Sequence, residues 1–171
     1  VMGLILRGVF LGRPKDVDWI YEAGGASRMF IDNWAGFQKP LAHTNAESEG
    51  QMVNRYYQLL TGPDELKRMA AAKAWAGWED SIATLQPAQS SAGDYEDAHF
   101  DLALARIECH YFVNQCFIEP NQLLNNMHKI SHIPGIIVHG RYDMICPAEQ
   151  AFEVYELWPE SQLHIVRDAG H

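Results

Sequence analysis

Apolar and polar positions along the chain predict a parallel sheet interrupted by a long helical stretch. Residues 1–12 contain one core strand, GLIL, which ends at a glycine-containing turn. Residues 13–127 have helical periodicity and no convincing strand, whereas residues 128–171 alternate strand, helix and strand. Such alternation is typical of βαβ units, so the predicted fold class is α/β with an all-helical insertion.

At least two helices are expected within the insertion, which should cover the carboxyl edge of the sheet, where ligands bind. The first helix should have Thr61 as its N-cap and Pro63 in its first turn. Its apolar stripe comprises Leu66, Met69, Ala70, Trp75, Trp78 and Ile82. The apolar stripe of the second helix comprises Phe100, Leu104, Ile107 and Tyr111. Four aromatic residues are interpreted as packing in this helical stretch: Trp19, Tyr21, Phe30 and Trp34.

Asp143 lies just past the carboxyl end of the predicted strand at 136–140. A structural interpretation is open here, because aspartate favours turns and Pro147 is well placed to start a helix. A functional interpretation has equal weight from position alone, because catalytic groups favour such loops.

His171 follows the next predicted strand through a short loop, 28 positions after Asp143. A right-handed parallel crossover brings the carboxyl ends of both strands to the same edge of the sheet, so the two side chains are expected to meet. A carboxylate that fixes an imidazole tautomer and stabilises its positive charge supplies two-thirds of an acyl-transfer triad. The sequence therefore predicts Asp143 and His171 as the acid and base of such a triad.

The nucleophile of this triad is not evident in the chain. The hydrolase order places a serine in Gly-x-Ser-x-Gly upstream of the acid, and no such motif occurs. Ser27, in GGASRM, lacks the closing glycine and follows no strand. We expect the nucleophile to precede Val1 in a longer protein, since the chain opens as if within a strand and closes on His171.

Two glutamates interrupt the apolar stripes of the two predicted helices. Glu79 lies four residues after Trp75, and Glu108 lies four residues after Leu104. Each is expected to have a partner, because a buried carboxylate without one is costly. One alternative is a salt bridge, for Glu108 with Arg106 or Arg55. The other is that both acids bind one cation, such as a substrate ammonium group.

Cys146 is interpreted as a small buried residue that lines the pocket. It is not expected to act as the nucleophile, because it follows the acid in the chain. No metal and no other cofactor is expected, since the remaining histidines show no ligand spacing and are interpreted as structural or exposed: His99, His110, His128, His132, His139 and His164.

Composition narrows the class of protein further. The 171 residues are 47% hydrophobic and 20% charged, enough for a folded core, and their net charge of −9 argues against nucleic acid as a partner. No apolar run approaches the roughly 20 residues that span a bilayer, so no membrane association is expected. Three cysteines without metal-ligand spacing indicate a reducing, cytoplasmic location.

Several motifs together resemble the proline iminopeptidase family of α/β-hydrolase serine peptidases. They are LRGVF, DWIYEAGGASRMF, AAKAWAGWE, HFDLALARIECHYFVN, NQLL, IPGIIVHGRYDMICP and LHIVRDAGH. The resemblance implies part of a hydrolase sheet, at 1–12 and 128–171, with an inserted all-helical cap domain at 13–127. It departs from the family in lacking the nucleophile half and in a QCFIEPNQ stretch that is one residue shorter.

The resemblance also implies residue roles and an activity. Asp143 and His171 would be the triad acid and base, Glu79 and Glu108 would hold the substrate's amino terminus, and Phe112 and Cys146 would line a proline pocket. The implied reaction is release of proline from the amino terminus of a peptide. Another capped hydrolase, such as an esterase or epoxide hydrolase, and a non-catalytic binding module remain alternatives. This chain alone is expected to be inactive, and the sequence does not predict an oligomeric state.

Overall fold

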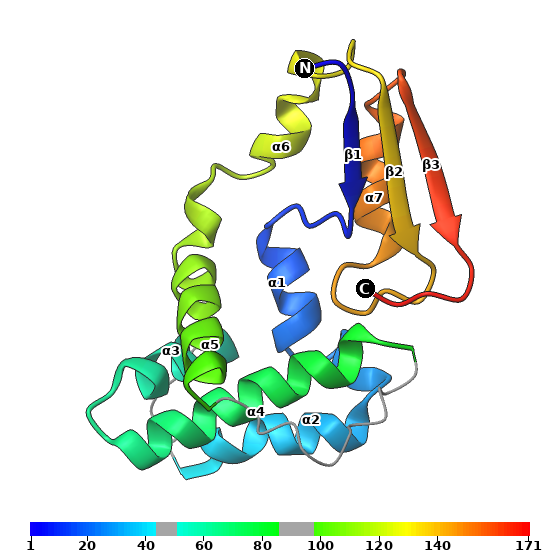
Figure 1. Cartoon of the computed structure of the whole chain (residues 1–171). Coiled ribbons are helices and arrows are strands. Elements are labelled where there is room, and N and C mark those ends of the chain that lie inside the picture. The colour runs from blue at the N-terminus through cyan, green and yellow to red at the C-terminus, as the bar shows by residue number, and fades with distance from the viewer. Residues whose placement is uncertain (44–50, 86–97) are drawn as a thin grey trace.

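A parallel sheet of three strands, in the order β1-β2-β3, forms one layer of the molecule (Figure 1). In this computed structural model, which describes residues 1–43, 51–85 and 98–171, β2 pairs with both neighbours. One helix, α7, joins β2 to β3 and packs against both strands. A mixed α/β fold with a parallel sheet is therefore confirmed. The elements span Leu4–Arg7 (β1), Gly135–Gly140 (β2), Ala148–Glu156 (α7) and Ser161–Val166 (β3).

The described elements between β1 and β2 are helices, and α1 to α4 lie beyond the carboxyl ends of the strands (Figure 1). The connection leaves the sheet through α1, and α5 and α6 carry it back toward β2. None of the helices in the described ranges is long and apolar enough to cross a membrane. Their bounds are Pro14–Tyr21 (α1), Ile31–Gln38 (α2), Met52–Thr61 (α3), Glu65–Ala83 (α4), Ala98–Val113 (α5) and Gln122–Asn125 (α6).

Two separate hydrophobic clusters stabilise these layers. The sheet cluster buries Ile137 and Trp158 between the strands and α7. The helical cluster is built on aromatic rings, with Trp75 stacked on Tyr21 at a centroid distance of 4.3 Å and Phe37 on Tyr56 at 4.6 Å. Aromatic pairs in such geometry stabilise a core beyond the area they bury. The helical region therefore has a core of its own, distinct from that of the sheet.

The prediction that Thr61 caps α4 is wrong. Thr61 is the last residue of α3, and α4 begins at Glu65. Asp64 is the N-cap, and its carboxylate accepts the backbone N–H of Lys67 at 3.1 Å. Pro63 disfavours helical geometry at Gly62, which accounts for the break between the two helices.

The predicted apolar face of α5 is also wrong. Three of its residues are at least half exposed: Phe100 at 63%, Ile107 at 59% and Tyr111 at 50%. The fully buried residues of α5 are instead Ala105 and Cys109. Small side chains permit close approach of α5 to α3 and α4, so this face packs inward although it carries less apolar surface.

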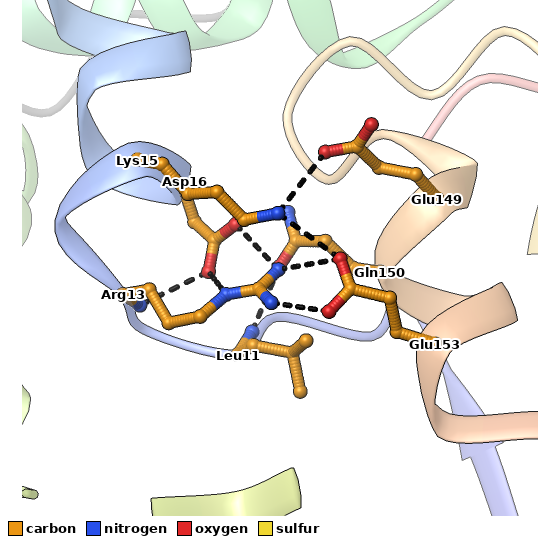
Figure 2. Close-up of polar contacts among 7 residues, drawn as sticks. All are labelled: Leu11, Arg13, Lys15, Asp16, Glu149, Gln150 and Glu153. Carbon is orange, nitrogen blue, oxygen red and sulfur yellow. Dashed lines mark hydrogen bonds and ion pairs between the residues drawn. The ribbon is translucent and has the colours of Figure 1, made fainter. Parts of the chain in front are cut away.

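A cluster of charged side chains joins α1 to α7 (Figure 2). Arg13 is 8% exposed and binds Asp16 through Nε at 2.8 Å and through a terminal nitrogen at 2.9 Å. Its guanidinium also binds Glu153, and Lys15 binds Glu153 at 3.1 Å. Burial alone would lower the pKa of Arg13, but hydrogen bonds to Asp16 and Glu153 raise it, so the guanidinium stays charged. The helical region is thus held to the sheet layer by ionic as well as apolar contacts.

Candidate active site

Asp143 and His171 lie at the same edge of the sheet, past the ends of neighbouring strands. Asp143 follows β2 and is 3% exposed, and His171 follows β3. The Nδ1 atom of His171 lies 2.9 Å from Oδ2 of Asp143. A carboxylate only accepts hydrogen bonds, so Nδ1 carries the proton and Nε2 is left free to accept one.

Close backbone contacts hold the loop of His171 against the loop of Asp143. A Cβ atom added at Gly140 would lie 2.0 Å from the carbonyl oxygen of Gly170, so only glycine fits there. The N–H of Tyr142 donates to the carbonyl of Ala169 at 3.0 Å. The N–H of His171 donates to the carbonyl of Ala83, at the end of α4, at 2.7 Å. The helical region and the sheet therefore both fix the imidazole.

Backbone and side-chain hydrogen bonds fix the carboxylate of Asp143. Its Oδ1 atom accepts the N–H groups of Ile145 at 3.1 Å and Cys146 at 2.7 Å. The buried ring of His139 spans the same loop, with Nδ1 3.4 Å from the N–H of Val9 and Nε2 2.6 Å from the carbonyl of Cys146. Nε2 of His139 is also 3.4 Å from Oδ2 of Asp143. These contacts assign the proton of His139 to Nε2 and aim the carboxylate at His171.

A cavity of about 370 Å³ opens beside His171, between the sheet edge and the helices. It brings together five of the six residues that the sequence singles out, and Asp143 lies behind His171. A larger apolar groove of about 960 Å³ runs along β1 and contains none of the six. The smaller cavity is the candidate site because it holds the titratable groups. It is lined by Gly8, Phe10, Ile20, Tyr21, Glu79, Asp80, Ala83, Glu108, Phe112, Ile145, Cys146 and His171.

The two glutamates meet in this cavity, although they belong to different helices. Glu79 on α4 and Glu108 on α5 both line it, and each carboxyl group shifts the pKa of the other. The hydroxyl of Tyr21 donates to Glu79, and the indole N–H of Trp75 donates to Oε2 of Glu108 at 2.8 Å. Each glutamate therefore accepts a hydrogen bond from an aromatic donor, and Arg55 donates to the carbonyl of Leu41.

Burial raises the pKa of both glutamates above the ordinary range. The pKa of Glu79 rises to about 8 through burial first and through the charge of Glu108 second. Burial also raises the pKa of Glu108, although the indole of Trp75 opposes the shift. A strongly perturbed acid pair in a cavity marks a candidate functional site.

Phe112 and Cys146 form part of the apolar wall of the cavity. The ring of Phe112 lies 6.0 Å from that of Phe10 and 5.3 Å from that of Tyr21, measured between centroids. Cys146 is 3% exposed, and burial raises the pKa of its thiol to about 12. The thiol therefore stays protonated near neutral pH and contributes a small apolar surface.

Asp143, Cys146 and His171 also present one potential metal-ligand atom each within 4.8 Å of one another. The protonated thiol of Cys146 is a poor ligand, because metals bind the thiolate. The carboxylate oxygens of Asp143 already accept two backbone amides and the imidazole. These contacts suit orientation of the imidazole better than metal coordination.

Three residues contribute to the site although the sequence indicates only packing roles for Tyr21 and Trp75 and a structural or exposed role for His139. Tyr21 and Trp75 do pack in the helical core, but their polar atoms bind the two glutamates. His139 connects the acid loop to the segment after β1. Buried tyrosine, tryptophan and histidine usually have hydrogen-bond partners, which was the available signal, but the partners lie on other elements. Ser27 is buried in a turn and binds the N–H of Gly24 at 2.9 Å.

Comparison with known proteins finds several relatives that share one name. No family model matches the chain. The chain is 43% identical over 169 residues to "Proline iminopeptidase" of Xanthomonas citri, covering 98% of this chain and 53% of that protein. It is 44% identical to "Probable proline iminopeptidase" of Leptolyngbya boryana (99% of this chain, 52% of that protein). It is also 44% identical to "Proline iminopeptidase" of Arabidopsis thaliana (100% and 44%).

These matches extend over nearly all of the chain. The chain spans about half the length of the curated relatives it matches. By sequence, the chain is a relative of the proline iminopeptidases and corresponds to about half of their length.

Proposed function

We propose that the full-length protein is a serine aminopeptidase that releases proline from the amino terminus of peptides. The observation that carries this proposal is one cavity that contains both an imidazole paired with a carboxylate and a pair of buried acids. The first pair is suited to acyl transfer, and the second is suited to binding an ammonium group. The names of the relatives in Xanthomonas citri and Arabidopsis thaliana support this combination.

The proposal includes an architecture for the whole protein. Residues 1–12 and 128–171 would belong to the sheet of an α/β-hydrolase, and residues 13–127 would form its helical cap domain. A serine outside this chain would supply the nucleophile. The position of the cavity, between the sheet edge and α4 and α5, supports a cap that contributes to the site.

In the proposed reaction, a serine outside this chain is the nucleophile, and His171 and Asp143 handle its proton. The serine hydroxyl attacks the carbonyl carbon of the amino-terminal proline while Nε2 of His171 takes the hydroxyl proton. The protonated imidazole, stabilised by Asp143, gives this proton to the leaving amine as the peptide bond breaks. Water then attacks the acyl-enzyme by the same route, and its proton passes through His171 back to the serine as free proline leaves.

Selectivity for a chain terminus would come from the helical side of the cavity. The aromatic wall that includes Phe10, Tyr21 and Phe112 suits a pyrrolidine ring. Glu79 and Glu108 would bind the secondary ammonium group through charge-assisted hydrogen bonds worth about 1.5–3 kcal/mol each. Only an unblocked amino terminus presents this cation, so internal peptide bonds would be poor substrates.

Hydrolysis of three compounds by the full-length protein tests this function. Proline naphthylamide should be cleaved, and N-acetylproline naphthylamide should be cleaved at least about 100-fold more slowly, because acetylation removes the cation that the glutamates bind. p-Nitrophenyl acetate serves as the measure of general esterase activity. Equal rates on the free and acetylated prolyl compounds, or activity on the ester alone, would contradict the proposal.

Glu108→Gln is expected to raise the KM for proline naphthylamide by about 10- to 100-fold, because the amide keeps the side-chain shape and loses the charge. The rate constant for acetate ester hydrolysis should change by less than about twofold, since the triad is untouched. Glu65→Gln, in the exposed first turn of α4, is the matched control. Unchanged KM in the Glu108 variant would show that this glutamate does not bind the amino group.

A further inference from the structure

The acid pair of the cavity is held by two neighbouring aromatic donors. Glu79 and Glu108 line the same cavity, and the charge of Glu108 raises the pKa of Glu79. Each also accepts a hydrogen bond from an aromatic donor, Tyr21 to Glu79 and Trp75 to Glu108. Because the rings of Tyr21 and Trp75 stack at 4.3 Å, the two donors form one rigid unit.

The pKa values of Glu79 and Glu108 are shifted by burial, by neighbouring acids and by the two aromatic donors. The charged or titratable groups that act on it are Tyr21 from α1, Asp80 from α4 and Cys109 from α5. His171 and Cys146 line the sheet side of the same cavity. Two ionised carboxylates that act on each other in a partly buried site repel each other, which favours retention of one proton.

We propose that Glu79 and Glu108 share one proton while the cavity is empty and release that proton when an organic ammonium group binds between them. Tyr21 and Trp75 are positioning residues in this exchange, because each holds one of the two carboxyl groups at the cavity. The released proton passes to water or buffer. The positive charge of the bound ammonium group then balances the carboxylate charge that the proton had neutralised. This inference rests on the proposed function, since it concerns how the same site receives the amino group.

The exchange has a definite dependence on pH. The pKa of Glu79 is raised by burial and by Glu108, so the empty pair holds its proton below about pH 8. A bound cation favours the ionised pair and lowers the pKa of the complex. Between these two pKa values, affinity for the cation rises with pH, because the empty site binds more protons than the occupied one.

Calorimetry on the full-length protein with pyrrolidinium chloride tests the exchange directly. Pyrrolidine is a non-hydrolysable secondary amine that stays protonated between pH 6 and 8, as aliphatic amines do. Titrations at pH 7 in buffers of different ionisation enthalpy should give release of roughly 0.5 to 1 proton per cation bound. The Kd should fall about tenfold between pH 6.5 and 8. A binding enthalpy that is the same in every buffer, or no binding, would overturn the inference.

Conservative variants separate a positioning role from a structural one. Tyr21→Phe removes the hydrogen bond that lowers the pKa of Glu79. The pH at which the pair loses its proton should therefore move upward by roughly one to two units. Tyr155→Phe, on α7, is the matched control and should leave the profile unchanged. A weaker Kd in Tyr21→Phe with an unshifted pH profile would contradict the positioning role.

Failure of this inference and failure of the proposed function give different results. If pyrrolidinium binds without proton release while proline naphthylamide is cleaved, the exchange is overturned and the peptidase proposal stands. If proline naphthylamide is not cleaved, the proposed function is contradicted whatever the calorimetry shows.

Discussion

Replacing Asp143 by asparagine in the full-length protein is expected to lower kcat for proline naphthylamide by about 10⁴-fold. Asparagine retains an oxygen for the N–H groups of Ile145 and Cys146, which lie 3.1 and 2.7 Å from Oδ1, so the loop should keep its shape. The second oxygen, 2.9 Å from Nδ1 of His171, is replaced by an NH₂ group that donates instead of accepting. The imidazole then loses its correct tautomer and the stabilisation of its charged form.

Stopped assays and thermal unfolding of the same samples check this expectation. Asp168→Asn, an exposed residue in the loop before His171, is the matched control and should keep kcat within about twofold. The Asp143 variant should unfold at nearly the temperature of the parent protein, which attributes its loss to chemistry. A loss of less than tenfold in a folded Asp143→Asn variant would remove Asp143 from the triad.

Arg13→Met is expected to destabilise the protein by about 3–5 kcal/mol, because it leaves Asp16 without its charged partner. Asp16 is 2% exposed, and the guanidinium of Arg13 binds both of its carboxylate oxygens, at 2.8 and 2.9 Å (Figure 2). The same guanidinium joins α1 to Glu153 on α7. Activity should also fall at urea concentrations below those that unfold the protein. Loss of the contact between α1 and α7 would displace Tyr21, which α1 carries into the cavity, from the sheet layer.

Urea unfolding of two further variants separates burial from simple loss of charge. Lys15→Met removes ion pairs with Glu149 and Glu153 that are largely exposed, so its cost should be below about 1 kcal/mol. The double variant Arg13→Met with Asp16→Met removes both buried charges and should be more stable than Arg13→Met alone. Equal costs for Arg13→Met and Lys15→Met would contradict the role assigned to the buried pair.

The sequence predicted the strands and the edge at which they end. An apolar run followed by a helix and a second strand indicates a parallel crossover, and the structure places β2, α7 and β3 in that order. The loops that carry Asp143 and His171 follow from this topology alone. Their position required no knowledge of any other part of the chain.

Helix boundaries and helix faces were predicted less well, for physical reasons. Threonine favours N-cap positions, so the sequence indicates Thr61, but Asp64 occupies the N-cap of α4 just after Pro63. Large apolar residues were assigned to the inner face of α5, but close packing selected Ala105 and Cys109. Hydrophobic periodicity indicates which residues share a face of a helix. It does not indicate how closely that face approaches a neighbouring helix, and a close approach favours small side chains.

Contacts between residues that lie far apart in the sequence cannot be predicted from the sequence pattern. Arg13 and Glu153 lie 140 positions apart, and Tyr21 and Glu79 lie 58 positions apart. Glu79 and Glu108 were identified as anomalies on apolar faces, but not the aromatic donors that bind them. A carboxylate in an apolar stripe indicates that a partner exists, and only the packing of α1, α4 and α5 determines which partner it is.

The central claim is that one cavity joins the acyl-transfer pair to the acid pair, so that both act on the same prolyl residue. A crystal structure of the full-length protein with L-prolinal, an aldehyde that a serine nucleophile traps reversibly, tests it most directly. We expect the ring nitrogen within hydrogen-bonding distance of both Glu79 and Glu108, with the ring against Phe112 and the former aldehyde carbon facing His171. A ligand bound with its nitrogen toward solvent, or seated in the groove along β1, would show that the two pairs do not act on one prolyl residue.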